Sequence, residues 1–295
     1  MGGTLSTRTA VTVPVTTGGH NETASSPAPA PPTCDDDVRI ETACRVVLDN
    51  LKTTRKTNDT NVSHGDAKKE AMLEMMDLFW NGPKAHHLLT SVDACKAVLE
   101  TIRHHPEHTG IQQHGMGAMK NMSCNRRALA KLAELGVSEV IWSTLNRHLE
   151  HSGVQREGML AMLMSSDNTQ VQQQFIDLGA CQLCCNTLRR HLQHADVQVS
   201  AMCAMNSHSK HPKAKQKLTE LGAFKTILDS LRLHTDHGAV QKQGMRVIMV
   251  LSHNNLEVQK QLKDLGAPQT VLQVIERHVE DVDIQRMGEF ILSLF

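Results

Sequence analysis

The sequence predicts an all-α fold built from a repeated helical unit, and three observations carry this prediction. Aromatic residues make up only 2% of the chain, with no Tyr, whereas Met reaches 15. A core filled by Met, Leu, Val, Ile and Ala consists mostly of good helix formers. Two dipeptide markers also recur at intervals of 43 or 44 residues, which is typical of a stacked repeat architecture. The markers are Leu135-Gly136, Leu178-Gly179, Leu221-Gly222 and Leu265-Gly266, and Ile111-Gln112, Val154-Gln155, Val197-Gln198, Val240-Gln241 and Ile284-Gln285.

Residues 1–37 precede the repeats and differ from them in composition. They are rich in Thr, Ser, Pro and Gly and include the run Ser-Pro-Ala-Pro-Ala-Pro-Pro at 26–32. Such a segment buries too little apolar surface to offset its chain entropy, so a disordered N-terminal tail is expected. Its first residues, Met-Gly-Gly-Thr-Leu-Ser, match the N-myristoylation pattern at Gly2. One acyl chain gives only marginal membrane affinity, so membrane attachment is expected only if Gly2 is acylated.

Residues 38–295 form the predicted repeat domain. In the unit that starts at Val154, the apolar spacing predicts helices over 154–165, 168–178 and 180–193, with Gly179 ending the second in the left-handed conformation. An insertion of seven residues in the first unit predicts an exposed loop over 52–66. The terminal unit, 282–295, would stop after its first helix. Its uncovered apolar face would suit a partner, self-association or a continuation of the chain.

The first helix of each unit carries a small residue four positions after the Val or Ile of the marker. A small residue lets two helices approach to the short end of the ~8–10 Å range. Met follows it in five units, and three residues further on stands Met in four of them and Ile in the fifth, a spacing that we interpret as core packing. The small residues are Ala71, Gly115, Gly158, Ala201, Gly244 and Gly288, and the first Met column is Met72, Met116, Met159, Met202 and Met245.

A period near 43 with three helices per unit, the second ending in Leu-Gly, resembles the armadillo repeat. The resemblance covers residues 38–295 and is strongest to the armadillo region of leucine-rich-repeat kinases and related proteins. It implies an armadillo-type α-solenoid, a right-handed superhelix of about six three-helix repeats. Importin-type and catenin-type repeats carry Trp and, four residues later, Asn on the groove-lining helix. The matching pairs here are Leu73/Asp77, Gly117/Asn121, Leu160/Met164, Cys203/Ser207, Arg246/Val250 and Phe290/Leu294, of which only Asn121 fits.

The helix face that would line the groove combines basic and apolar residues. Four of the six residues one turn before the Trp position are Lys or Arg. We expect this face to bind a protein partner with acidic and apolar side chains, such as an amphipathic helix; an ordinary solvated helix face is the alternative. The candidate binding residues are Lys69, Leu73, Gln113, Asn121, Arg156, Leu160, Met164, Lys242, Arg246, Val250, Arg286 and Phe290.

Histidine forms two further columns, but their spacing argues against a shared metal. Equivalent residues of adjacent units would lie ~10 Å apart, whereas zinc ligands lie ~2 Å from the ion. The only nearby additional ligands are Cys181, Cys184 and Cys185, and the last two align with core positions. We therefore expect no metal site, and His side chains that close the last turn of each third helix by donating to free carbonyl groups. The columns are His105, His148, His191, His234 and His278, and His108, His151, His194 and His237.

The remaining features narrow the function class. No phosphate loop, HExxH, GxSxG or kinase motif set occurs, so no catalytic residue, no cofactor and no enzyme activity is expected. Lys plus Arg and Asp plus Glu both number 31, so no bulk positive charge favours nucleic acid. No apolar run approaches the ~20 residues of a membrane span, and no secretory signal is present. We therefore expect a cytoplasmic location with reduced thiols. The protein would be peripheral to a membrane only if Gly2 is acylated.

The sequence thus predicts a non-catalytic protein–protein interaction scaffold. Two alternatives stay open at this point. One is a regulatory armadillo segment of a larger kinase-like signalling protein, and the other is a His-rich metal or pH sensor.

Overall fold

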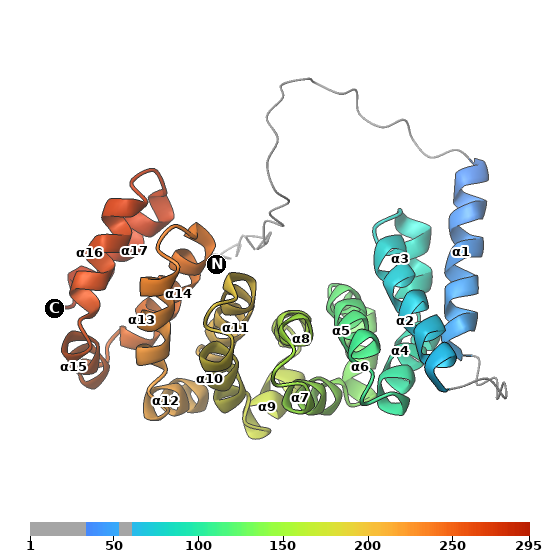
Figure 1. Ribbon diagram of the computed structural model, residues 1–295, viewed down its shortest axis with the longest axis horizontal. Helices are drawn as coiled ribbons and strands as arrows, with labels where there is room; N and C mark the ends of the chain where they lie inside the picture. Colours follow the sequence, from blue (N-terminus) through green and yellow to red (C-terminus); the bar gives the residue numbers. More distant parts are fainter. Residues whose placement is uncertain (1–33, 53–60) are drawn as a thin grey trace, which may run out of the picture. The chain divides into compact units, whose positions relative to one another are not determined.

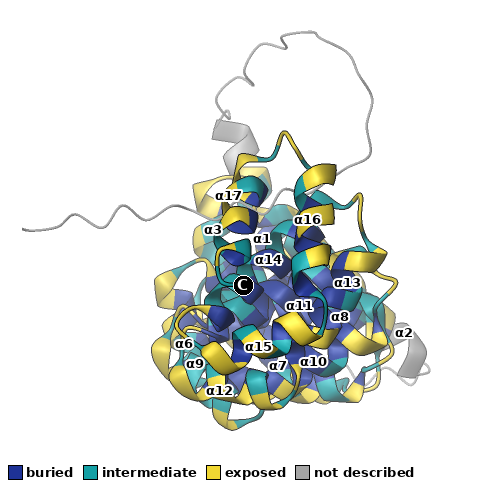
Figure 2. Ribbon diagram, turned by 90° about the vertical axis from the view of Figure 1, so that its left-hand side faces the viewer, coloured by how far each residue is buried: buried dark blue, intermediate teal, exposed yellow. Residues whose placement is uncertain are grey.

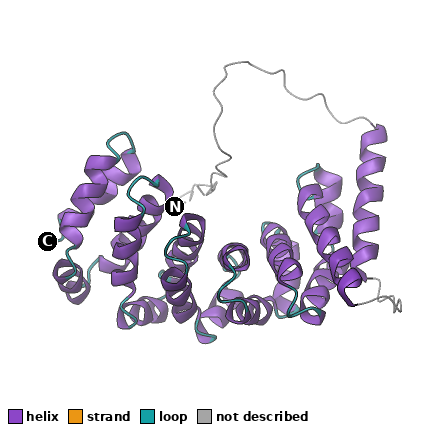
Figure 3. Ribbon diagram, in the orientation of Figure 1, coloured by secondary structure: helices purple, strands orange, loops and turns teal. Residues whose placement is uncertain are grey.

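The computed structural model describes residues 34–52 and 61–295, and within these ranges every regular element is a helix. The described residues form seventeen helices and no strand (Figure 3). Residues 34–295 belong to one compact unit. The prediction of an all-α fold is confirmed for the described part of the chain.

The helices follow one another in triplets, with one helix before the first triplet and one after the last. The leading helix is α1 (Cys34–Lys52). The triplets are α2 (Asn61–Leu78), α3 (Pro83–Leu89) and α4 (Val92–His104); α5 (Thr109–Ser123), α6 (Arg126–Glu134) and α7 (Val137–Arg147); α8 (Ser152–Ser165), α9 (Thr169–Asp177) and α10 (Ala180–Arg190); α11 (Ala195–His208), α12 (Pro212–Glu220) and α13 (Ala223–Leu233); and α14 (Gly238–Ser252), α15 (Leu256–Asp264) and α16 (Ala267–Arg277). The final helix is α17 (Val282–Leu292).

Two expected boundaries are wrong by several residues. Helix α1 begins at Cys34, so residues 34–37 are helical and do not belong to the tail. Helix α2 begins at Asn61, so the expected loop 52–66 is shorter at both ends, because Lys52 closes α1 and residues 61–66 are helical. The rest of that loop and of the tail, Gly2 included, lies outside the described residues. One helix within 282–295 was expected, and α17 occupies that position.

In three triplets an Asn cap and a left-handed Gly explain where the second helix, α6, α9 or α15, begins and ends. The Asn168 side chain precedes α9 and accepts hydrogen bonds from the backbone N–H groups of Gln170 and Val171, at 3.0 and 3.2 Å. At the other end Gly179 has φ = 91°, a left-handed conformation that glycine adopts without strain. Three further Leu-Gly markers have the same geometry, at Gly136, Gly222 and Gly266. The Leu-Gly marker is therefore the sharp turn between the second and third helices.

Small residues on the first helices allow each to pack closely on the third helix of the preceding triplet. A Cβ atom added at Gly158 in α8 would lie 2.5 Å from Cδ2 of Leu145 in α7. The equivalent distance from Gly244 in α14 to Cδ2 of Leu231 in α13 is 2.6 Å. The adjacent Met159 is fully buried, as expected for core packing.

The triplets form successive layers in chain order (Figure 1). The first helices α2, α5, α8, α11, α14 and α17 each contact the next, and so do the third helices α4, α7, α10, α13 and α16. Buried residues lie where the layers meet, and exposed residues lie on the outward faces (Figure 2). The first helices consequently present a continuous face made of one helix from each layer.

Candidate partner-binding face

The recurring Gln of the sequence marker connects each layer to the one before it. Gln155 of α8 donates from Nε2 to the carbonyl oxygens of Leu145 and His148, at 2.7 and 3.0 Å. Its Oε1 accepts a hydrogen bond from Oγ1 of Thr187 in α10, at 2.7 Å. These three bonds join the end of α7 to both α8 and α10. Gln112 makes the same three bonds one layer earlier, with Thr144 as the donor to its Oε1.

A lysine takes the place of this Gln in the first triplet. Lys68 is buried and donates from Nζ to the carbonyl oxygen of Leu51 at the end of α1, at 2.6 Å. Burial lowers the pKa of its ammonium group. Because Lys has no acceptor atom, Thr101 donates to the backbone instead, to Ala97 at 2.7 Å. Sequence reasoning missed Lys68, although it lies three residues before Ala71, where the other units have Gln.

The two histidine columns perform different tasks. His148 bonds through Nε2 to the carbonyl oxygen of Pro106, at 2.8 Å, and His191 does so to Leu149 at 2.7 Å. Both acceptors lie in the loop of the preceding layer, not in the histidine's own helix, so the expected donation is confirmed but the expected acceptor was wrong. His151 is instead the N-cap of α8, and its Nδ1 accepts the backbone N–H of Val154 at 3.2 Å.

At this N-cap the Nδ1 atom of the ring accepts the hydrogen bond through its lone pair. His108 and His237 cap α5 and α14 in the same way. Asp281 replaces them before α17, where its Oδ1 accepts from the N–H groups of Asp283 and Ile284, at 3.1 and 3.2 Å. A carboxylate can only accept here, so Asp281 performs the same N-cap role as the histidine rings of this column. The sequence analysis did not predict this role for the second histidine column.

The cysteines beside the histidine columns are buried thiols. Burial raises the pKa of Cys181 to about 11 and of Cys185 to about 12, and raises that of Cys184 well above its usual range. A protonated thiol is a poor metal ligand, and Nε2 of His191 is already hydrogen-bonded. Within 34–52 and 61–295, no three His, Cys, Asp or Glu side chains cluster as metal ligands would.

The basic column of the candidate face pairs largely with acids of the protein itself. Lys242 of α14 lies 2.9 Å from Asp281 and 3.3 Å from Asp283, on the layer that follows. The hydrogen bond to Asp281 is the main cause of its raised pKa. Arg156 of α8 pairs with Glu157 and lies 4.0 Å from Asp196 of α11. At these two positions the basic groups therefore already have acidic partners within the chain.

The geometry of neighbouring first helices explains this pairing. Four residues of this column lie against the position about 40 residues later in the chain, near the start of the next first helix: Lys69, Gln113, Arg156 and Lys242. Where that position is Gly110, the side chain of Lys69 covers it, and a Cβ there would lie 2.7 Å from Lys69 Cδ. Where that position is Asp196 or Asp283, an ion pair forms. Sequence columns alone do not reveal pairs between different columns of successive units.

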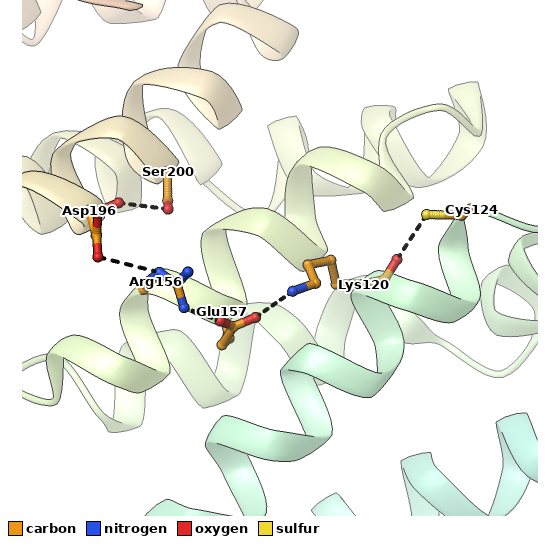
Figure 4. A network of polar contacts seen from close by, with 6 residues as sticks. All are labelled: Lys120, Cys124, Arg156, Glu157, Asp196 and Ser200. Atoms are coloured by element: carbon orange, nitrogen blue, oxygen red, sulfur yellow. Dashed lines mark hydrogen bonds and ion pairs between the residues drawn. The ribbon is translucent and has the colours of Figure 1, made fainter. Parts of the chain in front are cut away.

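Glu157 lies at the centre of a polar network that sequence reasoning missed (Figure 4). It is 5% exposed, and its carboxylate contacts Arg156 of the same helix and Lys120 of α5, the latter at 2.9 Å. The buried carboxylate thus has two cationic partners from the chain itself. Asn121, the one residue that fitted the peptide-binding pattern, is also 5% exposed and does not lie open on this face.

The accessible part of the candidate set is smaller than the sequence suggested. Arg246 of α14 and Arg286 of α17 form no hydrogen bond or ion pair with any residue in the described ranges. Gln113 is half-buried beside Gly153. The apolar candidates are all half-buried, and the ring of Phe290 lies 6.0 Å from that of His253. These apolar candidates are Leu73, Leu160, Met164, Val250 and Phe290.

Comparison with known proteins supports the fold alone. No protein-family model matches the chain, and no curated protein matches it. The chain is similar to the crystal structure of an engineered protein from the Northeast Structural Genomics Consortium, with a TM-score of 0.67 and 16% sequence identity. The similarity covers 87% of this chain and 96% of the engineered one. None of the described helices is long and apolar enough to cross a membrane.

Proposed function

We propose that this chain is an armadillo-type α-solenoid that acts as a non-catalytic scaffold and binds a protein partner on the face of its first helices. The support is the layer-by-layer repetition of helix triplets, left-handed glycines and Gln bonds in chain order. Repeat proteins of this kind typically bind partners along a surface to which each layer contributes one helix. We also propose a cytoplasmic location, with membrane contact only if Gly2 is acylated.

The partner-binding site is proposed to lie on α14 and α17, with α8 contributing apolar contacts. One observation carries this choice: Arg246 and Arg286 are without ion pairs in the described structure, whereas Arg156 and Lys242 are neutralised by neighbouring acids. An unpaired guanidinium beside half-buried apolar side chains suits a ligand with both acidic and apolar groups. An amphipathic helix with one acidic edge has that chemistry. The apolar contacts would come from Leu160, Met164, Val250 and Phe290.

The proposal is tested by reversing the two unpaired charges. Arg246→Glu together with Arg286→Glu should weaken a bound partner at least tenfold, because each carboxylate repels the acid it should have paired with. The matched control is Lys213→Glu with Lys260→Glu, two exposed lysines on α12 and α15, outside the proposed site.

The assay has two stages. Proximity labelling in cells first identifies proteins that the wild-type chain and the control reach but the α14/α17 variant does not. Titration calorimetry then measures the affinity of each such purified protein for the wild-type chain, the control and the Arg246/Arg286 variant. Equal affinity of the wild-type chain and the Arg246/Arg286 variant for every such protein removes the proposed site.

A buried histidine, His208, supports the alternative hypothesis of a pH sensor. His208 at the end of α11 is 1% exposed, and burial lowers the pKa of its ring to about 4. Neither ring nitrogen has a hydrogen-bond partner in the described structure. Protonation of such a ring opposes folding, which makes the stability of the scaffold sensitive to acid.

A further inference from the structure

At one point of the face formed by the first helices, the chain places a carboxylate between basic groups of two layers. On α5 and α8 this is the carboxylate of Glu157, which contacts Arg156 of its own helix and lies 2.9 Å from Nζ of Lys120 (Figure 4). A Cβ atom added at Gly117 of α5 would lie 3.5 Å from Oε2 of the same carboxylate. An anion at this point is therefore within reach of the Arg156 position and of the Gly117 position.

The same point on α14 and α17 has two basic groups but no carboxylate of its own. By the spacing of the repeat, Arg246 stands at the Gly117 position, and Arg286 stands at the position of the arginine beside Glu157. Met287 replaces the glutamate and is 7% exposed. An anion at this point would thus contact guanidinium groups from both helices.

Contacts on either side of the two arginines show that α14 and α17 lie level with each other. Before the arginines, Nζ of Lys242 lies 3.3 Å from the carboxylate of Asp283. After them, the ring of His253 lies 6.0 Å from that of Phe290. The arginines follow the ion pair by four residues on α14 and by three on α17, which keeps both on the same face, one turn further along. Packed helices lie ~8–10 Å apart, a gap that two Arg side chains can close around one group.

Neighbouring acids leave these arginines unpaired within the described ranges. Asp283 is already engaged by Lys242. Glu289 stands in the column of core Met residues, whose members face the following layer. A Cβ atom added at Gly288, for example, would lie 3.2 Å from Cε of Met245. This places Glu289 on the side of α17 that faces away from α14, and no ion pair joins it to either arginine.

The balance of charge indicates which anion fits between the arginines. In the network of Figure 4, the two cations Lys120 and Arg156 face two carboxylates, those of Glu157 and Asp196. The arginines of α14 and α17 also carry two positive charges. A phosphate monoester carries about −1.5 to −2 at pH 7 and has three acceptor oxygens, whereas a carboxylate carries a single charge. Two guanidinium forks are suited to a phosphate because each can donate two parallel hydrogen bonds.

We propose that α14 and α17 bind a phosphorylated side chain of a partner protein, and that its phosphate lies between Arg246 and Arg286 at the place that Glu157 fills on α8. The half-buried side chains of Val250 and Phe290 lie further along the same two helices and would contact apolar residues that flank the phosphate. This inference rests on the proposed function, because it specifies the acidic group that the partner brings to the same site.

Three peptide libraries test the proposal on the immobilised full chain. They share degenerate flanking positions and differ only in the central residue, which is phosphoserine, Glu or Ser. Mass spectrometry measures the retained amount of each library. The phosphoserine library should be retained at least about tenfold more than the Ser library and about threefold or more above the Glu library, since its phosphate forms charge-assisted bonds with both arginines.

Substitutions at the proposed site separate the phosphate pocket from a general attraction of anions. Met287→Glu places a carboxylate of the chain itself between the arginines and should abolish the preference for phosphoserine. Met287→Gln is the neutral control of the same shape and should keep it. Arg246→Gln and Arg286→Gln should each lower retention of the phosphoserine library about tenfold. Arg156→Gln should leave it unchanged, because that arginine already has acidic partners. Circular dichroism confirms that each variant is folded.

Several results would overturn the phosphate site. These are equal retention of the phosphoserine and Glu libraries, retention of neither above the Ser library, and an unchanged preference for phosphoserine in the Met287→Glu variant. The proposed function fails separately, if the variant with Glu at both Arg246 and Arg286 keeps its affinity for every partner found in cells. A partner that this variant binds more weakly, but that the wild-type chain binds equally before and after phosphatase treatment, contradicts the phosphate site alone.

Discussion

Replacement of His208 by Leu should remove most of the acid sensitivity of this protein. The ring is buried against Phe175, and burial alone holds its pKa at about 4, below the ordinary value of 6.5. In the unfolded chain the ring takes up its proton near that ordinary value, so the unfolded state binds more protons between pH 6.5 and 4. Stability conferred by the neutral ring is therefore complete above about pH 6.5 and is lost as the pH falls towards 4.

The size of this effect follows from the shift. One pKa unit corresponds to about 1.4 kcal/mol, so the wild-type chain should lose about 2 to 3 kcal/mol at this site between pH 7.5 and 4.5. His208→Leu replaces the ring by the residue found at the same position in two other layers, Leu78 and Leu251. It also removes two buried nitrogens without partners. The variant should be at least as stable as the wild-type chain at pH 7.5.

Urea unfolding followed by circular dichroism measures the free energy of unfolding at pH 7.5 and 4.5. The loss between the two pH values is then compared between the wild-type chain and the His208→Leu variant. The exposed His87→Gln serves as the control for a general loss of a histidine. The reasoning is refuted if His208→Leu loses as much stability between the two pH values as the wild-type chain and the His87→Gln control do.

Three further outcomes are expected from urea unfolding at neutral pH. Thr187→Val should lower the free energy of unfolding by about 1 to 3 kcal/mol, because it leaves the buried Oε1 of Gln155 without its donor. Ser230→Ala should change it by less than about 0.5 kcal/mol, because the Ser230 hydroxyl has no hydrogen-bond partner among the described residues. Equal losses for the two variants would contradict this account. Gly158→Ala should destabilise by about 1 to 3 kcal/mol despite the higher helix propensity of Ala, since the new methyl meets a side chain of the preceding third helix at 2.5 Å; a stabilised variant would show that this helix is free to move. Asn168→Ala should cost about 1 kcal/mol through loss of the α9 cap, and an unchanged midpoint would remove that role.

Sequence reasoning predicted the features that depend on one column at a time. The Leu-Gly marker predicted the end of the second helix because only a residue that tolerates positive φ serves there, and Gly179 has that conformation. The small column predicted close helix contact, which Gly158 makes with Leu145. Such features repeat with the layers, so a single sequence contains several independent copies of the signal.

Features that join different columns were beyond the same reasoning. The partner of Lys242 is Asp283 in the next first helix, at a different position of the repeat, so neither column alone indicates the pair. Glu157 is buried between Lys120 and Arg156 although other layers have His114 or Ser200 at its position. The candidate residues lie on the first helices, and the charges of Arg156 and Lys242 are paired within the chain.

The most direct test of the account compares two glutamines on adjacent first helices. Gln155 is fully buried and bonds to three groups across two layers, whereas Gln113 is half-buried and makes no hydrogen bond with the described residues. If the repeated Gln holds the layers together, Gln155→Leu should lower the free energy of unfolding by about 3 kcal/mol or more, because three polar groups lose their partner. Gln113→Leu should change it by less than about 0.5 kcal/mol. Similar losses for both variants would contradict the claim that this column ties the layers.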